Sequence, residues 1–319
     1  MVYHIVVRTV LIFAVLLFAS TVPSRAQTSP NLTTIRVISS PSDDLRPMLY
    51  AQKAGLFTKA GLNVVLERSS SGAVVAQAIV GGAMDVGKAS LSSLIAAYAR
   101  GIPFELIAPS AIHRASSANS AVIVTTASPI RAPLDLQNKT VSCTAIGDIG
   151  YLGLRAMIDA QGGDSSTVKW VEIPTSAVAL AIEQGRVDAG VTTEPYMTKD
   201  LRSGKVRILV DMLNGYPRPI LESAFFATKD YVEKNRDVVA RFAKALQQAS
   251  SYSNTHEAET VPLFAAFGGL DADTAAQMHR TFTPTTFDAA QIQPVIDLAA
   301  KYKVIPRRFD AREFIAVSR

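Results

Sequence analysis

The sequence predicts an α/β fold of two similar lobes, each an open, mainly parallel sheet flanked by helices, with two crossover strands between them. A repeat supports this prediction: Gly82–Gly87 (GAMDVG) recurs as Gly185–Gly190 (GRVDAG). Each copy follows the same order of an apolar strand, a turn and a helix. Two copies with matching flanks indicate two related sheets rather than one.

The first lobe opens the chain after residue 26. In order, we expect a strand at 34–39, a helix at 47–60, a strand at 62–67, a turn at 69–72, a helix at 73–80, a helix at 91–100 and a strand at 104–109. The helix before the first repeat ends at Gly61, as helix C-termini often do. Alternating strands and helices favour a parallel sheet.

The second lobe repeats that order. We expect a strand at 139–145, a helix at 151–161, a strand at 168–173, a helix at 177–184 and a strand at 206–210. The apolar, β-branched segment 121–126 is the expected first crossing between lobes, and 223–228 is the expected return. These crossings divide the chain into residues 27–120 and 222–319 for lobe one and 121–221 for lobe two.

The last part of the chain has helical periodicity. Apolar residues recur at helical spacing in 237–252, and the segments 261–267, 272–282 and 289–302 have helical character too. We expect these helices to pack on lobe one. Core packing explains the apolar stripe of the first of them better than recognition of a partner does.

The N-terminus predicts export. Arg8 precedes the unbroken apolar run Val10–Ala19, and Ser24 and Ala26 are small residues at the spacing of a cleavage site. This run of ten residues is short for a membrane span, which needs about 20. We therefore predict a signal peptide over residues 1–26, cut after Ala26, and a periplasmic mature protein.

The composition of the mature chain argues against several functions. After removal of residues 1–26 it carries 30 basic and 27 acidic residues, without a basic run, so nucleic acid is a poor candidate partner. The four histidines show no metal-ligand spacing, and we expect neither a metal nor a cofactor. Cys143 is the only cysteine and lies in an apolar segment, where a buried strand residue is the default.

Several motifs together resemble those of the nitrate/sulfonate/taurine-type binding proteins, a group that also includes pyrimidine-precursor binding proteins. They are Tyr50–Phe57 (A-x-x-x-G-x-F), Gly82–Gly87, Ala97–Pro103 (A-x-x-x-G-x-P), Leu134–Val141, Gly185–Ala189 and Glu194-Pro195. Asn138 replaces the glycine that is usual in the fourth motif. The resemblance implies a two-lobed periplasmic binding protein without catalytic residues. It would deliver a small solute, such as a sulfonate, carboxylate or other anion, to an ABC permease, and we expect a monomer.

Candidate ligand residues follow from the predicted sheets. Ligands of open parallel sheets bind beyond the carboxyl ends of the strands, near helix N-termini that offer free N–H groups. The turns at these places nominate Ser40, Asp44, Ser71, Gly72, Lys88, Ser90, Gly147, Tyr151, Ser176, Thr193 and Glu194. The hydroxyl groups among them would serve equally well as helix caps.

Two of these positions carry charge immediately after the repeats. Lys88 would either meet an anionic group of the ligand or pair with a local carboxylate. Glu194 would bind an amine or contribute to the closed form that the permease recognises. Each repeat aspartate, Asp85 and Asp188, is expected to be structural. An arginine clamp for an anion would come from Arg46, Arg114, Arg155 or Arg218, and no motif supports any of these four arginines.

Two other functions remain open from sequence. The first is an enzyme on the same fold, either a desulfinase with Cys143 as nucleophile or a pyrimidine synthase. The apolar surroundings of Cys143 count against the desulfinase, and the absence of a cysteine-rich motif counts against the synthase. The predicted signal peptide counts against both. The second is a sensor that presents its ligand to a membrane receptor instead of an importer.

Overall fold

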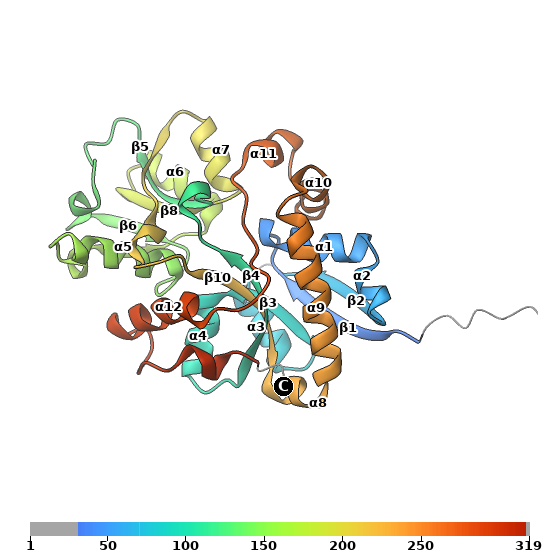
Figure 1. Cartoon of the computed structure of the whole chain (residues 1–319). Coiled ribbons are helices and arrows are strands. Elements are labelled where there is room, and N and C mark those ends of the chain that lie inside the picture. Colours follow the sequence, from blue (N-terminus) through green and yellow to red (C-terminus); the bar gives the residue numbers. More distant parts are fainter. Residues whose placement is uncertain (1–30, 70, 317–319) are drawn as a thin grey trace, which may run out of the picture. The chain divides into compact units, whose positions relative to one another are not determined.

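Two five-stranded sheets form the framework of the protein (Figure 1). The computed structural model describes residues 31–69 and 71–316, and residues from Leu32 onward form one compact unit. The expected signal peptide, residues 1–26, lies outside the described residues. Within the described part of the chain, no helix is long and apolar enough to cross a membrane.

The two sheets have the same topology. The first has the order β2 (Leu62–Arg68), β1 (Thr33–Ser39), β3 (Val86–Ser90), β10 (Leu221–Thr228), β4 (Phe104–Ile112). The second has the order β7 (Lys169–Glu172), β6 (Thr140–Cys143), β8 (Ala189–Thr193), β5 (Ser120–Thr125), β9 (Val206–Val210). Each begins with three parallel strands in the order second, first, third, followed by one antiparallel strand.

The antiparallel strand of each sheet is the one that begins after the chain has crossed from the other sheet. The chain leaves the first sheet at β4 and enters the second as β5, then leaves it at β9 and returns as β10. These strands coincide with the two predicted crossings. The predicted α/β fold of two similar lobes is confirmed, while the lobe boundaries remain a prediction.

Apolar side chains lie on both faces of the first sheet. In β1, Ile38 faces the core formed with α3 and α4, whereas Val37 faces the core formed with α1 and α9. In β10, Phe226 faces the first of these cores and Phe225 faces the second. This period of two, with apolar residues on both faces, is what a sheet covered by helices on both sides requires.

The helices largely match the predicted ones. They are α1 (Arg46–Lys53), α2 (Leu56–Lys59), α3 (Gly72–Val80), α4 (Leu91–Ala99), α5 (Ile149–Ala160), α6 (Val178–Glu183), α7 (Tyr196–Arg202), α8 (Lys229–Lys234), α9 (Arg236–Ser253), α10 (Glu257–Gly268), α11 (Ala272–Gln277) and α12 (Ala289–Lys301). The single helix expected at 47–60 is divided because Gly55 takes a left-handed φ of 67°. The helix expected at 272–282 ends at Gln277, since Phe282 pairs with Ile112 of β4.

The C-terminal helices do more than pack on lobe one. α9 lies against α1 as expected, but α12 lies against both α4 and α5, which flank different sheets (Figure 1). At the end of α12, the Tyr302 hydroxyl donates to the Asp159 carboxylate of α5 over 2.7 Å. α11 contacts α7 in addition. Besides packing on the first sheet's helices, the C-terminal helices therefore also connect the two sheets.

The repeat aspartates fasten equivalent strands. Asp85 donates its backbone N–H to the carbonyl of Arg36 in β1, and its carboxylate accepts the N–H of the same residue over 2.7 Å. Asp188 forms the same two bonds with Thr140 of β6, each 2.8 Å long. The structural role predicted for both aspartates is confirmed. Each one hydrogen-bonds the turn before the third strand of its sheet to the first strand.

The second glycine of each repeat permits close packing. A Cβ atom on Gly87 would lie 2.7 Å from the Val75 side chain of α3, and one on Gly190 would lie 2.5 Å from the Val178 side chain of α6. Both distances are shorter than any van der Waals contact. The helices that flank the sheets can approach them this closely only because a side chain is absent.

Gly190→Ala is expected to lower the free energy of unfolding by about 1–3 kcal/mol, because the added methyl group would overpack a core. Gly72→Ala is the matched control, since nothing lies within 4 Å of the place its methyl group would occupy and its φ is not left-handed. Urea unfolding of the mature protein measures both variants. Equal stability of the two variants would contradict the packing role of Gly190.

Candidate functional site

The candidate site begins where β1, β3, β4 and β10 meet the short helix Asp43–Leu45. The carboxylate of Asp44 is buried there and accepts hydrogen bonds from three serine hydroxyls: Ser42 at 2.5 Å, Ser223 at 2.5 Å and Ser110 at 3.1 Å. The ammonium group of Lys88 also forms an ion pair with this carboxylate. All acceptor positions of this carboxylate are therefore used inside the protein.

Lys88 is equally buried and its ammonium group donates to Asp44 and, over 2.5 Å, to Ser42. Burial alone would raise the pKa of Asp44, but Lys88 and the hydroxyl donors hold that pKa below its ordinary value. The Asp44 carboxylate is thus held in its charged form by the groups around it. Of the two sequence interpretations, the structure shows Lys88 paired with a local carboxylate.

A second carboxyl group lies beside this network. Glu222 is the extra residue of a β-bulge, because Leu221 and Ser223 of β10 pair with the consecutive residues Ile112 and Ala111. Its carboxylate accepts a hydrogen bond from the side-chain amide nitrogen of Asn119, at 3.3 Å. Burial raises the pKa of Glu222 to about 8, with Asp44 and Asp211 acting in the same direction and Asn119 and Lys88 opposing them.

The neighbouring crossover segments carry further buried polar groups. His113, just after β4, lies 3.3 Å from the Asp211 carboxylate that follows β9. The Asn119 side-chain oxygen and the Ser120 hydroxyl are buried and have no hydrogen-bond partner within the described residues. Glu222 and Asn119 were not predicted from the sequence. The available signal was a single carboxylate within the otherwise apolar or small segment 220–227.

Glu194, just after β8 of the second sheet, contacts two other parts of the chain. Its carboxylate accepts the backbone N–H and the hydroxyl of Thr198 in the first turn of α7, at 3.1 and 2.9 Å. It also accepts the backbone N–H of His279, from the segment after α11, at 3.0 Å. The backbone N–H of Glu194 in turn donates to Asn119 over 2.9 Å. This residue therefore connects lobe two to the C-terminal segment and to a crossover strand.

The remaining predicted residues occupy the ends of strands or the starts of helices. Ser71 caps α3 through the N–H of Val74, Gly72 is the first residue of that helix, Ser90 lies before α4, Ser176 lies before α6, and Thr193 ends β8. The Ser40 hydroxyl is buried without a partner in the part of the chain that the structure describes. Their roles as ligand contacts stay predictions.

Gly147 and Tyr151 face other protein groups. A methyl group on Gly147 would meet Val304, and the buried Tyr151 packs edge-on against Trp170. The Tyr151 hydroxyl also accepts a 2.7 Å hydrogen bond from Arg155. Asp148, between them, caps α5 by accepting the backbone N–H of Tyr151.

The four arginines considered for an anion clamp have different positions. Arg46 is fully buried and pairs with Asp43 at 2.9 Å. Arg114 lies over the ring of Phe282, and Arg155 lies against Tyr151 and Tyr302. Arg218 is exposed, and the described residues give it no ion-pair partner. These positions do not bring the four guanidinium groups together.

Cys143 is fully buried in β6. Burial, together with Asp148 and Glu172, raises the pKa of its thiol to about 12. A nucleophilic cysteine needs the opposite shift, because the thiolate is the reactive form. Among the described residues there is also no group of three or more His, Cys, Asp or Glu side chains arranged to hold a metal ion.

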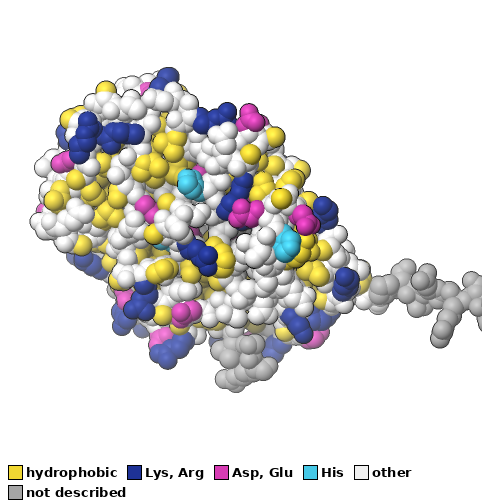
Figure 2. Space-filling view, turned by 45° about the horizontal axis from the view of Figure 1, so that its top comes forward, with side chains coloured by type: hydrophobic (Ala, Val, Ile, Leu, Met, Phe, Trp, Pro, Cys, Tyr) yellow, Lys and Arg dark blue, Asp and Glu magenta, His cyan; other side chains and the backbone are white. Residues whose placement is uncertain are grey.

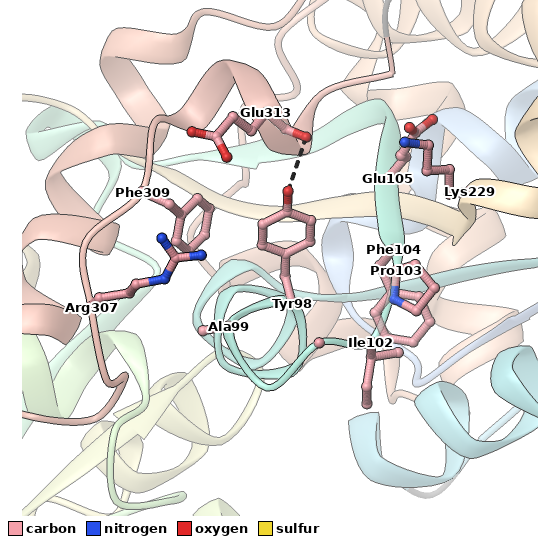
Figure 3. A pocket seen from close by; sticks show the side chains of 11 residues that line it. Tyr98, Ala99, Ile102, Pro103, Phe104, Glu105, Lys229, Arg307, Phe309 and Glu313 are labelled. Atoms are coloured by element: carbon pink, nitrogen blue, oxygen red, sulfur yellow. Dashed lines mark hydrogen bonds between the residues drawn. The ribbon is translucent and has the colours of Figure 1, made fainter.

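A cavity of about 360 Å³ lies at the opposite end of the first sheet (Figure 3). Tyr98, Phe309 and Arg307 line one part of it, and Glu105 and Lys229 line another. Glu105 is next to the first residue of β4, whereas the crossover to lobe two begins at the last. The length of this strand, about 26 Å at its usual rise, separates the cavity from Glu222 and Asn119, here called the Glu222 cluster.

The sequence comparisons assign the family. Residues 43–260, more than half of the chain, match the family described as NMT1/THI5 like. The chain belongs to this family. It is 26% identical over 200 residues to a protein named as an aliphatic sulfonates-binding protein of Escherichia coli (strain K12), covering 61% of each chain. It is also 26% identical over 200 residues to the taurine-binding periplasmic protein of the same organism, covering 62% of this chain and 60% of the relative.

These matches span about three fifths of the length of the curated relatives. Solved structures extend the similarity in fold: the periplasmic aliphatic sulphonate binding protein SsuA from Escherichia coli has a TM-score of 0.75 at 22% identity, covering 89% of this chain and 97% of that one. A desulfurization enzyme, DSZB, shares the fold with a TM-score of 0.65 at 15% identity, over 89% and 96% of the two chains. The fold therefore serves both binding proteins and an enzyme.

The surface carries both signs of charge. Figure 2 shows basic and acidic side chains interspersed between apolar and uncharged ones on this face of the molecule. The ion pairs Lys199–Asp271 and Arg202–Asp273, each 3.9 Å long, lie between α7 and the start of α11. Exposed pairs of this length contribute little to stability.

Lys88→Met is expected to lower the free energy of unfolding by about 3–5 kcal/mol, because it leaves the Asp44 carboxylate buried without its counter-charge. Lys234→Met is the control, since Lys234 pairs with Asp230 on the surface of α8 and is 70% exposed. Thermal or urea unfolding should leave the control close to the parent protein. If Lys88→Met were as stable as Lys234→Met, the Asp44 network would not hold this end of the sheet together.

Proposed function

We propose that this protein binds a small solute between its two lobes and delivers it to an ABC permease in the membrane. Residues 1–26 would be removed on export, and residues 27–120 and 222–319 would form one lobe and 121–221 the other. The observation that carries the proposal is the pair of matching sheets exchanging crossover strands, in a chain of the NMT1/THI5-like family. Relatives with binding-protein names support it.

The geometry suits reversible capture. The crossover strands β5 and β10 are the connections about which the lobes would rotate, and the Glu222 cluster lies where they meet. Glu194 and His279 already form a hydrogen bond across this boundary. Closure over a solute would bury polar groups from both lobes, and the permease would recognise that closed form.

Catalysis is the weaker alternative. A desulfinase mechanism needs a reactive cysteine, and the raised pKa of the Cys143 thiol disfavours its thiolate. The pyrimidine-synthase alternative needs a cysteine-rich motif, and this chain has one cysteine. A sensor that presents the same ligand to a receptor would share the cleft. A permease and an ATPase encoded beside this protein would favour the importer.

The test is a thermal-shift screen of the mature protein against sulfonates, carboxylates, nitrate, pyrimidines and amines. A true ligand should raise Tm increasingly with concentration, because it binds the folded state alone. Small-angle scattering with that ligand should show a smaller radius of gyration, as expected for lobe closure. Stabilisation without compaction would contradict the hinge, and catalytic turnover of the stabilising solute would favour the enzyme instead.

A further inference from the structure

We propose that Glu222 determines the specificity of the cleft by binding a protonated amino group of the solute. This inference rests on the proposed function of solute binding and names the chemical class of the ligand. It concerns one end of the solute, so the other end remains free to be anionic, as in an aminosulfonate or an amino acid.

The backbone gives Glu222 its position. A β-bulge at this residue interrupts the pairing of β10 with β4, and bulges re-aim a side chain out of the regular alternation of a strand. The bulge lies at the start of β10, where the chain returns from lobe two. Glu222 remains half-buried rather than enclosed, while its neighbours Leu221 and Ser223 are buried. A group at this place can contact a molecule held between the lobes.

The partners of Glu222 leave it short of positive charge. The Asn119 amide is its one hydrogen-bond donor among the described residues, at 3.3–3.5 Å. Lys88 is nearby, but its ammonium group is committed to Asp44 and Ser42. The carboxylates of Asp44 and Asp211 are also close enough to repel a negative charge on Glu222, which raises its pKa further.

The other basic side chains of the region also lie against carboxylates. Arg46 and Arg280 lie 2.9 and 3.7 Å from the Asp43 carboxylate, and His113 lies 3.3 Å from Asp211. The carboxyl of Glu222 therefore has a pKa raised to about 8 by burial, and it is largely protonated at neutral pH without a ligand. An ammonium group would supply the missing counter-charge.

Unpaired acceptors beside Glu222 fit the same ligand group. An ammonium ion has three N–H donors, of which one would go to Glu222. The Asn119 side-chain oxygen is buried and, among the described residues, has no partner, and Asn119 already contacts Glu222 through its amide nitrogen. A donor-rich group bound here would satisfy both residues at once, whereas a sulfonate or carboxylate would add a further negative charge.

Binding would move one proton. The solute arrives as an ammonium ion, and the Glu222 carboxyl gives its own proton to the buffer as the ion pair forms. Because the free carboxyl has a pKa of about 8, amine affinity should rise with pH between about 6 and 8. A ligand without an ionised amine would need no such release.

The experiment is titration calorimetry at pH 7 with matched probes: 2-aminoethanesulfonate against ethanesulfonate, and 3-aminopropanoate against propanoate. Each titration is repeated in two buffers of different ionisation enthalpy, which counts the protons released. We expect an amine-bearing probe to bind at least tenfold more tightly than its partner and to release close to one proton. Glu222→Gln should lose at least tenfold in affinity and release no proton.

Glu105→Gln is the matched control, because burial also raises the pKa of Glu105, which lines the distant cavity. Its affinity and proton release should equal those of the parent protein. Equal binding of amine-bearing and amine-free probes, unchanged binding by Glu222→Gln, or failure of every amine would overturn the inference. The proposed function would survive any of these if another solute from the screen stabilised and compacted the protein, and would fail if none did.

Discussion

One buried carboxylate, that of Asp44, holds together the end of the first sheet at which the chain passes between lobes. It joins the segment after β1 to Lys88 of β3, Ser110 of β4 and Ser223 of β10. A buried charge is costly unless it is paired and hydrogen-bonded, and here both oxygens of the carboxylate are occupied. Because β10 is the returning crossover strand, this network fixes where the chain re-enters the lobe and hence where Glu222 lies.

The duplicated aspartates and glycines explain why the two lobes are alike. Asp85 and Asp188 each fasten a third strand to a first strand, and Gly87 and Gly190 each let a helix approach. The same six-residue motif makes these contacts in both sheets, so its repetition in the sequence carries most of the information. That is why sequence alone predicted the fold, the two crossings and the structural role of the aspartates.

The site was harder to predict because each of its pairings occurs once, so no repeated motif marks the two partners. Lys88 follows a repeat and was recognisable, but its partner Asp44 comes from another turn, so the sequence left both a ligand role and an ion pair open. Glu222 lies in a bulge that only the register of β10 against β4 reveals. The bridging position of α12 was also hidden, since an apolar stripe does not say which surface it covers. Asn138, in contrast, takes the left-handed φ of 62° that the family's glycine suggests.

The central claim is that a solute binds between the lobes, beside the crossover strands. Hydrogen exchange with and without the solute that most raises Tm tests it most directly. The account predicts slower exchange in both lobes, at the segments 40–46, 88–92 and 192–198, and around Asn119 and Glu222. Protection confined to one lobe, or to the cavity beside Tyr98, would contradict it.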